Sequence, residues 1–524
     1  MEYTPHLRLL DLLAGHDDEP ALIEGSTRIS RGVLRQSAHH AARHLHHLGL
    51  RRGDTIALWL PNGAAWLQVL FACAELGVLV VPISTRYKQA EVRHLLDVSR
   101  ARLLVVPRRF LDQDYAAQAA ELQRSIETLE QHLVIEDPAQ VMALPDVPPL
   151  TSHPDVPGTA FAVPDPGQLD DLLCCFSTSG TTGFPKLAAH GHHSIARHAW
   201  HVARAFGIRS GDAMLCALPF YGVFGFMTVL TTLAGGGACV LQPVFDAQEA
   251  AHLVATHRIT HAVGSDSMFA PMLDQPDIDW HSLRHIIQAD FVGLSAAVTE
   301  RGQTLGITCS GTYGSSELYA LMSLHDWRAP VAQRALAGGV PLDPSIQIRV
   351  VDPDDGRELA NDEAGELQVR GPNLLACYLN NPEATGKAFT ADGWFGTGDL
   401  ATRQGPGFTY LARMGDSLRL RGYLVNPSEI ENELMAHPAV SGAQVVGVKL
   451  PGQGDVAVAY VTLQADDPGE TALQAHCKAR LANYKIPQRV VVVDAFPIVN
   501  GPNGGKIQKR VLREWARELL GDSA

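Results

Sequence analysis

The sequence predicts an α/β protein in which a large N-terminal domain, made of two α/β units and a small β region, precedes a smaller α+β domain. Three observations support this fold class. With 524 residues, the chain is longer than one hydrophobic core usually covers. Strand-like and helix-like apolar patterns alternate through the first half, which is typical of a parallel sheet. Between Ile346 and Tyr410 the pattern changes to short apolar runs separated by Gly, Asn, Asp and Pro.

The first α/β unit is predicted from alternating patterns early in the chain. Apolar runs predict strands over Ile56–Leu60, Val78–Ile83 and Arg102–Val106, and the first two flank a predicted helix over Ala65–Leu76. The stretch from Asp137 to Gly167 is rich in Pro, Asp and Ser and has no clear period. It is therefore expected to be a surface connection before the next sheet.

The second α/β unit is expected to begin with a strand over Leu172–Phe176. An amphipathic pattern predicts a helix over His193–Phe206, and the strand pattern resumes over Gly235–Val240 after a glycine cluster. The small β region follows, with short runs such as Glu366–Arg370.

A new unit is expected after Arg413. Asn426 and Pro427 supply a capping residue and a helix-starting proline before a predicted helix over Glu429–Met435. The remaining length of about 110 residues suits a compact α+β domain.

Composition and charge narrow the class of function. With 46% hydrophobic and 19% charged residues, the chain is neither disordered nor fibrous. A net charge of -14 without a basic cluster disfavours nucleic acid and anionic membranes as partners. No apolar run approaches the roughly 20 residues of a spanning helix, and the start has no basic leader, so a cytoplasmic location is expected.

The cysteines and histidines show no pattern of a metal or hydrolase site. The eight cysteines form no CxxC pair or zinc spacing, so reduced, buried thiols are expected. The 23 histidines are scattered and are expected to lie mostly on the surface. Neither H-E-x-x-H nor G-x-S-x-G occurs, which disfavours zinc and serine hydrolases.

The segment Ser177–Lys186 has the chemistry of a triphosphate-binding loop. Its glycines let backbone N–H groups turn towards an anion, its hydroxyls add donors, and its lysine adds a positive charge. A flexible Ser/Gly linker is the alternative, but linkers rarely lie between a buried strand and a helix-initiating segment. No Walker G-x-x-x-x-G-K-[ST] pattern is present, which disfavours ordinary P-loop NTPases. The predicted phosphate ligands are Thr178, Ser179, Gly180, Thr181, Thr182, Gly183 and Lys186.

This loop resembles the signature of the adenylate-forming superfamily, which includes acyl-CoA synthetases, peptide-synthetase adenylation domains and beetle luciferases. Further stretches resemble family motifs in the expected order from Leu218 to Lys506, so the resemblance covers nearly the whole chain. It implies that the small β region is a distorted β-barrel and that the C-terminal domain is mobile. The implied bounds are 1–411 for the N-terminal domain, 412–416 for the hinge and 417–524 for the C-terminal domain.

Two motifs imply the nucleotide and metal ligands. Tyr313, Gly314, Ser315, Ser316 and Glu317 resemble the family element in which the aromatic ring stacks on adenine and the carboxylate helps to hold magnesium. The residue types agree, because a flat ring suits a purine face and a hard cation prefers carboxylate oxygen. Alone, this pentapeptide is also compatible with a turn that carries a core tyrosine. The stretch 393–400 is similar to the family's Gly-Trp-x-x-Thr-Gly-Asp, which implies that Asp399 accepts the ribose hydroxyl protons.

The C-terminal matches imply a swinging domain. Arg413 resembles the arginine that contacts the ribose, and Gly415 occupies the hinge position where family members usually carry Asp or Lys. Glycine permits the rotation between half-reactions, but a charged hinge is missing. Lys506 resembles the catalytic lysine that reaches the site while the acyl-adenylate forms, where a cation would stabilise developing phosphate charge. Gly422 is placed along the passage of the thiol.

The acid pocket is placed by order along the family pattern. The stretch 218–225 resembles the one in which relatives place a gate beside the carboxylate, and Gly222 takes that place. No acidic residue stands in the usual ammonium-binding part, so an apolar acid is favoured over an amino acid, with fatty, alicyclic and aryl acids all open. The candidate pocket residues are Tyr221, Gly222, Phe224, Asp266, Met268, Phe291 and Gly293.

Together these matches predict an acid:CoA ligase that uses ATP and Mg²⁺. It would adenylate a carboxylic acid with release of pyrophosphate and then transfer the acyl group to CoA with release of AMP. Two alternatives stay open. One is an enzyme that stops at the acyl-adenylate or loads the pantetheine arm of a carrier protein. The other is a catalytically silent AMP- or acyl-binding protein, which predicts damage to the phosphate loop, Glu317 or Lys506, and none of these is damaged.

Overall fold

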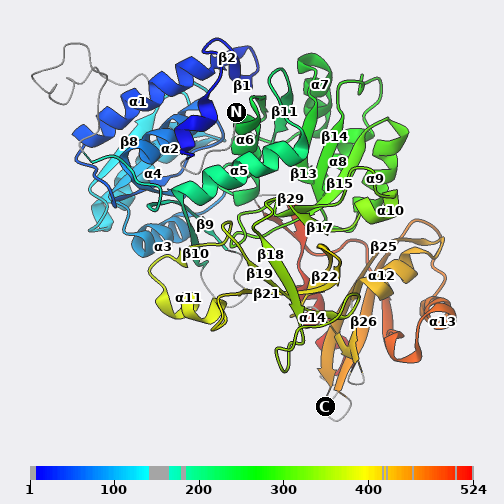
Figure 1. Ribbon diagram of the computed structural model, residues 1–524. Helices are drawn as coiled ribbons and strands as arrows, with labels where there is room; N and C mark the ends of the chain where they lie inside the picture. The colour runs from blue at the N-terminus through cyan, green and yellow to red at the C-terminus, as the bar shows by residue number, and fades with distance from the viewer. Residues whose placement is uncertain are drawn as a thin grey trace, which may run out of the picture.

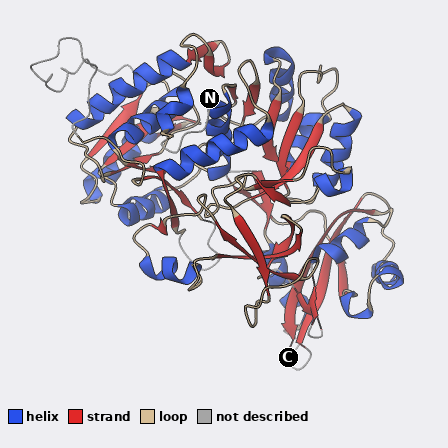
Figure 2. Ribbon diagram, viewed as in Figure 1, coloured by secondary structure: helices blue, strands red, loops and turns tan. Residues whose placement is uncertain are grey.

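The computed structural model of the chain describes residues 7–140, 165–178, 185–415, 418–420, 423–425, 427–450, 454–501 and 504–521. The predicted α/β class is confirmed, with a large N-terminal and a smaller C-terminal domain (Figures 1 and 2). Most of the expected surface connection between 137 and 167 lies outside the described residues. No described helix has the length and apolar character needed to cross a membrane. All eight cysteines are free and seven are buried, as predicted.

The first sheet has seven strands in the order β20-β10-β9-β4-β3-β5-β8. Its strands are β3 (Thr55–Leu58), β4 (Leu79–Pro82), β5 (Leu103–Pro107), β8 (Gln131–Ile135), β9 (Leu172–Ser177), β10 (Leu187–Gly191) and β20 (Cys377–Tyr378). One prediction was wrong: β9 was expected to open the second sheet, but it pairs with β4, with Cys174 opposite Val80. Both faces of β9 are buried, so its apolar run did not reveal which sheet it joins.

Helices cover both faces of this sheet. The helices before β9 are α1 (Arg31–His47), α2 (Ala64–Leu76), α3 (Gln89–Ser99) and α4 (Tyr115–Ser125), with a short 3₁₀ helix (Leu9–Leu13) and a small hairpin of β6 (Arg109–Phe110) and β7 (Gln113–Asp114). Alternate residues of β3 point to different cores, since Ile56 packs with α2 whereas Ala57 packs with α3 and α4. The core around Ile56 extends into the second unit, so the two α/β units share one apolar interior.

The second sheet is a path of thirteen strands in the order β18-β19-β21-β22-β17-β16-β15-β14-β13-β11-β12-β1-β2. Its α/β part contains β1 (Pro20–Glu24), β2 (Thr27–Ser30), β11 (Ala213–Cys216), β12 (Ala238–Leu241), β13 (His261–Ser265), β14 (His285–Ala289) and β15 (Thr308–Tyr313), with α5 (His192–Phe206), α6 (Val223–Gly235), α7 (Ala247–His257), α8 (Asp266–Leu273) and α9 (Ser295–Thr304). The strand predicted from Gly235 begins at Ala238, because Gly235 ends α6 and Gly236 caps it in a left-handed conformation.

The predicted small β region is antiparallel and continues this path. It contains β16 (Ser323–Leu324), β17 (Gly338–Pro341), β18 (Gln347–Val351), β19 (Ala364–Arg370), β21 (Phe395–Gln404) and β22 (Gly407–Arg413), with the short helices α10 (Val331–Arg334) and α11 (Pro382–Ala388). Strand β20 leaves this region and pairs with β10 at the edge of the first sheet. The β region therefore touches both sheets.

The C-terminal domain has its own sheet, with helices on both faces. Its elements are β23 (Leu418–Leu420), β24 (Tyr423–Val425), α12 (Pro427–Met435), β25 (Val440–Leu450), β26 (Gly454–Leu463), α13 (Glu470–Arg480), a 3₁₀ turn (Asn483–Lys485), β27 (Arg489–Val492), β28 (Ile498–Gly501), β29 (Gly504–Ile507) and α14 (Lys509–Leu520). On β25, Val445 packs with α12 and α13, whereas the next residue, Val446, packs with α14. The predicted capping residue Asn426 lies outside the described residues.

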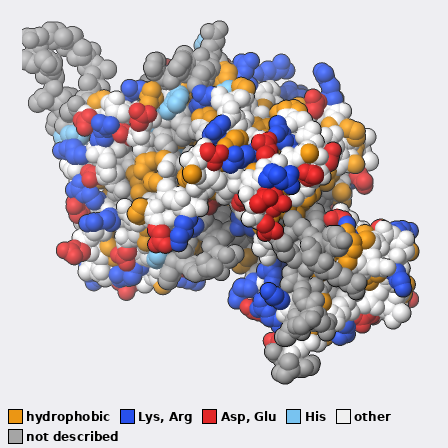
Figure 3. Space-filling model, turned by 60° about the horizontal axis from the view of Figure 1, so that its bottom comes forward, with side chains coloured by type: hydrophobic (Ala, Val, Ile, Leu, Met, Phe, Trp, Pro, Cys, Tyr) orange, Lys and Arg blue, Asp and Glu red, His pale blue; other side chains and the backbone are white. Residues whose placement is uncertain are grey.

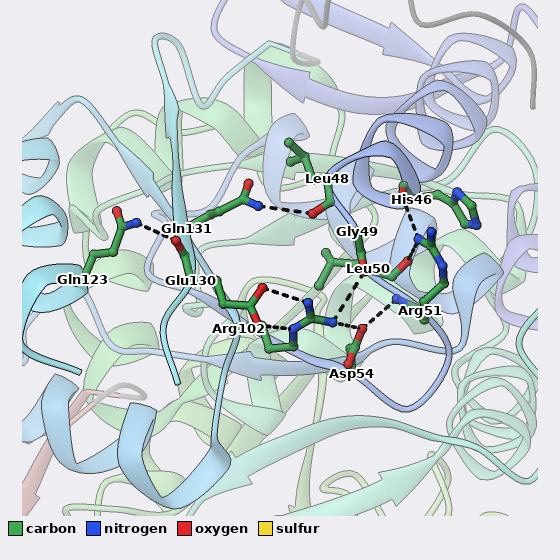
Figure 4. Close-up of polar contacts among 10 residues, drawn as sticks. All are labelled: His46, Leu48, Gly49, Leu50, Arg51, Asp54, Arg102, Gln123, Glu130 and Gln131. Atoms are coloured by element: carbon green, nitrogen blue, oxygen red, sulfur yellow. Dashed lines mark hydrogen bonds and ion pairs between the residues drawn. The ribbon is translucent and has the colours of Figure 1, made fainter. Parts of the chain in front are cut away.

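A polar network fixes one edge of the first sheet (Figure 4). The guanidinium group of Arg102 contacts the carboxylates of Asp54 at 2.6 Å and Glu130 at 2.7 Å. Gln131 Nε2 donates to the carbonyl of Leu48. These residues stand at the amino ends of β3, β5 and β8, so the opposite, carboxyl edge is the one at which the predicted phosphate loop begins. On the face shown in Figure 3, acidic and basic side chains are interspersed.

Candidate active site

The predicted phosphate loop is closed at its base by a β-hairpin. The Thr178 N–H donates to the carbonyl of Lys186 at 2.9 Å, and Ser177 pairs with Leu187. The helix-initiating segment expected after Lys186 is absent, since β10 intervenes and α5 begins only at His192. Thr178 Oγ1 is buried and has no hydrogen-bond partner among the described residues. The other predicted ligands, Ser179, Gly180, Thr181, Thr182 and Gly183, lie outside the described residues.

The segment from Tyr313 to Glu317 leaves the end of β15 in a tight turn. The Ala320 N–H donates to the carbonyl of Ser315 at 2.9 Å. A Cβ at Gly314 would lie 2.7 Å from Cα of Ala320, so only glycine fits this close approach. The next residues, 319–321, all have positive φ, which side chains other than glycine rarely adopt. A turn with this backbone conformation needs stabilising contacts from other segments of the chain.

Two buried histidines hold the turn. His190 Nε2 lies 2.7 Å from the carbonyl oxygen of Ser316, and His198 Nε2 lies 2.9 Å from that of Ala320. Burial lowers the pKa of His190 to about 3 and of His198 to about 4, so both rings are neutral at physiological pH and donate from Nε2. The histidines were expected to lie mostly on the surface, and that expectation does not hold for these two. His190 on β10 and His198 on α5 are both buried.

The predicted ribose ligands meet at one carboxylate. Tyr313 Oη donates to Asp399 Oδ2 at 2.6 Å, and Arg413 Nε lies 3.3 Å from Asp399 Oδ1. Strand pairing places Asp399 on β21 directly opposite Arg413 on β22. Burial raises the pKa of Asp399, while the Tyr313 hydroxyl and the Arg413 charge act in the opposite direction.

The ring of Tyr313 is enclosed by its neighbours. Only 6% of the residue is exposed, and its ring packs edge-on against Phe408 and beside Tyr410. Stacking of this ring on adenine stays a prediction. The contact that the structure shows is the hydrogen bond from the Tyr313 hydroxyl group to Asp399.

Sequence reasoning missed Tyr378, which joins two of the predicted ligands. Its hydroxyl donates to Glu317 Oε1 at 3.0 Å, and Lys186 Nζ lies 4.1 Å from its ring centroid. Burial and the charge of Glu317 raise the pKa of Tyr378 above its ordinary range, so the phenol stays protonated. No local motif marks this residue, since both contacts depend on the pairing of β20 with β10.

The residues present fit a nucleotide and one magnesium ion. Thr178 Oγ1 lacks a hydrogen-bond partner among the described residues, and Asp399 Oδ1 is a buried acceptor that faces the Arg413 guanidinium group at 3.3 Å. No group of three metal-ligating side chains occurs in the described part of the chain. Magnesium bound with a nucleotide usually needs only one or two carboxylates, because phosphates and water supply the rest. Glu317, with its second carboxylate oxygen available, suits that role.

The predicted acid pocket lies at the start of α6 and α8. Tyr221 is buried with its hydroxyl beside Ser84 and Thr85, and Gly222 is the N-cap of α6. Phe224 and Met268 are also buried, at 5% and 6% exposure, and both belong to the apolar core that the two α/β units share.

Asp266 differs from the other candidates, because its carboxylate is already used. It is fully buried and accepts hydrogen bonds from the N–H groups of Phe291, Val292 and Leu294. These contacts shape the loop that contains Phe291 and Gly293, the latter in a left-handed conformation. Its direct contact with an acid substrate stays a prediction.

A second carboxyl group missed by the sequence lies beside it. Desolvation and a hydrogen bond with Asp266 raise the pKa of Asp290 to about 7, and the charge of Glu431 acts in the same direction. Asp290 is exposed as a residue, while its carboxyl group faces the buried carboxyl group of Asp266. The pair lies where the neighbouring parallel strands β13 and β14 end.

The C-terminal domain reaches the pocket through β29. This strand carries Lys506 opposite Val499 and lies next to α8 (Figure 1). The Lys506 side chain and Gly422 lie outside the described residues. The predicted hinge residue, Gly415, accepts a hydrogen bond at its carbonyl from Arg513 Nη2 on α14, at 3.0 Å.

Comparison with known families identifies the family to which the chain belongs. A model of the AMP-binding enzyme family matches residues 11–379, and a model of its C-terminal domain matches residues 429–501. The chain belongs to the AMP-binding enzyme family. This confirms the predicted adenylate-forming superfamily and the predicted enzyme class, an AMP-forming acid–thiol ligase.

Similar members of the AMP-binding enzyme family cover nearly the whole chain. A 3-[(3aS,4S,7aS)-7a-methyl-1,5-dioxo-octahydro-1H-inden-4-yl]propanoyl:CoA ligase of Rhodococcus jostii (strain RHA1) is 31% identical over 94% of this chain and 95% of the relative. ATP-bound MatB from Rhodopseudomonas palustris is 25% identical, with a TM-score of 0.85 over 98% of this chain and 99% of that one. O-succinylbenzoate coenzyme A synthetase of Bacillus subtilis, in complex with ATP and magnesium ion, is 26% identical, with a TM-score of 0.77 over 93% and 96%. The predicted ATP, Mg²⁺ and CoA are thereby confirmed at the level of the AMP-binding enzyme family.

Proposed function

We propose that this protein activates a carboxylic acid with ATP, releases pyrophosphate, and then transfers the acyl group to CoA with release of AMP. The observation that carries the proposal is the convergence of Tyr313, Asp399 and Arg413 from three strands, with Glu317 beside them. A buried carboxylate has room for several hydrogen bonds on its two oxygens, so Asp399 can accept from the hydroxyl groups of a ribose in addition to its contacts with Tyr313 and Arg413.

In the first step, the described side chains bind and orient ATP. Asp399 and Arg413 would hold the ribose, and Thr178 with Lys186 would contact the phosphates. Magnesium held by Glu317 would supply positive charge to the phosphate oxygens. Lys506 would approach from β29 and stabilise the charge that develops as the acid attacks, a role typical of a preplaced donor.

In the second step, the C-terminal domain would rotate about Gly415 and admit the thiol past Gly422. The proposed bounds are residues 1–411 for the N-terminal domain, 412–416 for the hinge and 417–524 for the mobile domain. The hydrogen bond from Arg513 to the Gly415 carbonyl would hold the hinge in the domain arrangement of this structure. Rotation requires this bond to break, and a backbone without a side chain absorbs that change most readily.

The acid is proposed to be apolar and bulky. The walls at Phe224 and Met268 are apolar, and Gly222 leaves the gate position without a side chain. The similar ligase from Rhodococcus jostii acts on a propanoyl group attached to a fused bicyclic ring, which supports an alicyclic acid of that size.

A panel of fatty, alicyclic, aryl and amino acids tests the proposal. Each acid is incubated with ATP and Mg²⁺ and scored for pyrophosphate, and then with CoA and scored for thioester. We expect both products with bulky alicyclic acids and little pyrophosphate with amino acids. Acyl-adenylate without thioester would favour an enzyme that loads a carrier protein, for which the uncharged hinge at Gly415 is the motivating observation. Absence of pyrophosphate with every acid would contradict the proposal.

A further inference from the structure

Tyr378 lies between the two charged groups that the proposed function assigns to phosphate and metal. Its hydroxyl contacts the carboxylate of Glu317, and its ring contacts the ammonium group of Lys186. Among the described residues, no ion pair joins Lys186 to Glu317 directly. The tyrosine therefore separates a cation and an anion that would otherwise be free to neutralise each other.

The strand register places Tyr378 there. Tyr378 on β20 pairs with Ala188 on β10. Opposite residues of an antiparallel pair share a face, and so do residues two apart on one strand, so Lys186 and Tyr378 lie on the same side of the hairpin. Two backbone bonds flank this pair, from Leu379 N–H to the carbonyl of Leu187 and from Ala376 N–H to that of Ala189.

The same segment also holds the backbone of the metal-binding turn. The Leu375 N–H donates to the carbonyl of Glu317 at 2.8 Å, and Asn373 Nδ2 donates to that of Leu318 at 2.8 Å. Glu317 therefore accepts one hydrogen bond at its main-chain carbonyl, from Leu375, and one at its side chain, from Tyr378. Because Tyr378 is only 5% exposed, its ring has little freedom to move away.

We propose that Tyr378 is a positioning residue that aims the Glu317 carboxylate at the metal and keeps Lys186 unpaired with it until the triphosphate arrives. This inference rests on the proposed function, in which Glu317 binds magnesium and Lys186 binds phosphate. The hydroxyl group fixes Oε1 and leaves Oε2 for the cation. The ring holds the lysine by a cation–π contact, which is weaker than an ion pair and easily exchanged for phosphate oxygen.

The test measures metal binding without turnover. Mn²⁺ replaces Mg²⁺, the probe nucleotide is α,β-methylene-ATP, and bound Mn²⁺ is followed by electron paramagnetic resonance with no acid present. Tyr378→Phe keeps the ring and removes the hydroxyl. We expect it to weaken Mn²⁺ binding about tenfold, the lower end of the range for groups that orient metal ligands. Tyr115→Phe is the matched control, because it also removes a buried phenol hydrogen bond, to the carbonyl of Thr85, and it should leave Mn²⁺ binding unchanged.

A double-mutant cycle separates positioning from a general structural effect. If Tyr378 acts through Glu317, Tyr378→Phe should change Mn²⁺ affinity by less than about twofold in a Glu317→Gln background, because the carboxylate that it orients is gone. An equal tenfold loss in both backgrounds would overturn the proposal, as would an unchanged affinity in Tyr378→Phe itself.

The ring contact is tested by comparing Tyr378→Leu with Tyr378→Phe. Both variants lack the hydroxyl, but only leucine lacks the ring. We expect leucine alone to weaken metal-free binding of α,β-methylene-ATP severalfold, because Lys186 can then pair with Glu317. Identical nucleotide affinities would overturn this part. If the wild-type chain binds neither nucleotide nor Mn²⁺, the proposed function itself falls, whereas normal wild-type binding with unaffected variants overturns only the role of Tyr378.

Discussion

The nucleotide half of the site and the acid half are built from different interactions. In the nucleotide half, three segments contribute Tyr313 with Glu317, Tyr378, and Asp399, and they meet through directional hydrogen bonds of 2.6 and 3.0 Å. The acid half consists mainly of buried apolar side chains. The buried carboxylate of Asp266 in this half accepts hydrogen bonds from backbone N–H groups. Polar geometry tolerates few residue types, whereas apolar walls tolerate many. Under the proposed function, the first half would determine the type of reaction, and the second would determine which acid enters.

The largest effect is expected from removing the proposed catalytic lysine. Lys506→Ala should lower the rate of adenylation about 100- to 1,000-fold, the usual loss when one preplaced donor is removed. Thioester formation from supplied acyl-adenylate should be spared. Pyrophosphate release measures the first step, and thioester yield from the acyl-adenylate measures the second. Equal loss of both steps would contradict the assigned role.

A substitution within the nucleotide half comes next. Asp399→Asn removes the charge of a buried acceptor and should weaken ATP binding about 10- to 100-fold, because hydrogen bonds to charged groups are stronger than those to neutral ones. Titration calorimetry with α,β-methylene-ATP gives the affinity. Asp392→Asn is the control, because it breaks an exposed pair with Arg349 and should change the affinity less than twofold. Similar losses in both variants would argue against a ribose ligand.

A substitution within the acid half should change selectivity but leave ATP binding intact. Phe224→Ala removes an apolar wall and should shift relative kcat/KM between a small and a bulky acid about tenfold, as expected for a few methylene groups in a pocket. The KM for ATP should stay within twofold. If instead the KM for ATP rises and acid preference does not, the division into two halves is wrong.

The smallest effect concerns Asp290 and pH. Its pKa of about 7 lies above the ordinary 3.8, so the folded state keeps a proton that the unfolded state has released. The resulting stability is complete below pH 4 and is lost as pH rises to about 7. Compared with Asp290→Asn, the wild-type melting temperature should fall between pH 5 and 7 and level off above 8. Asp274→Asn, which removes an exposed carboxylate at the C-terminus of α8, should show no such difference.

Much of the nucleotide half could be predicted from the sequence, because its residues stand in ordered motifs whose residue types match the chemistry. Tyr313, Asp399 and Arg413 are brought together as those motifs imply. Tyr378 could not be found in this way, since its partners are distant in sequence and meet it only through strand pairing. The pair of Asp266 and Asp290 left a weak signal, because both residues follow apolar strands that end at the same edge of a parallel sheet.

The errors in the fold have a similar origin. Strand β9 reads as a buried strand in either sheet, and only its tertiary contact with β4 decides the matter. The segment after Lys186 resembles the start of a helix in sequence, because β10 is short and contains two alanines. Local pattern identifies elements well, but it does not give their partners.

The two-residue strand β20 also limits the order in which the protein can form during synthesis. Strand β10 has no outer neighbour in the first sheet until Cys377 and Tyr378 arrive, nearly two hundred residues further along the chain. A ribosome adds about 5 to 20 residues per second, so this edge stays open for roughly ten seconds or more while the second sheet emerges. The first sheet is thus the first to be synthesised but is completed late. An open sheet edge of this kind is where a nascent chain is most exposed to mispairing.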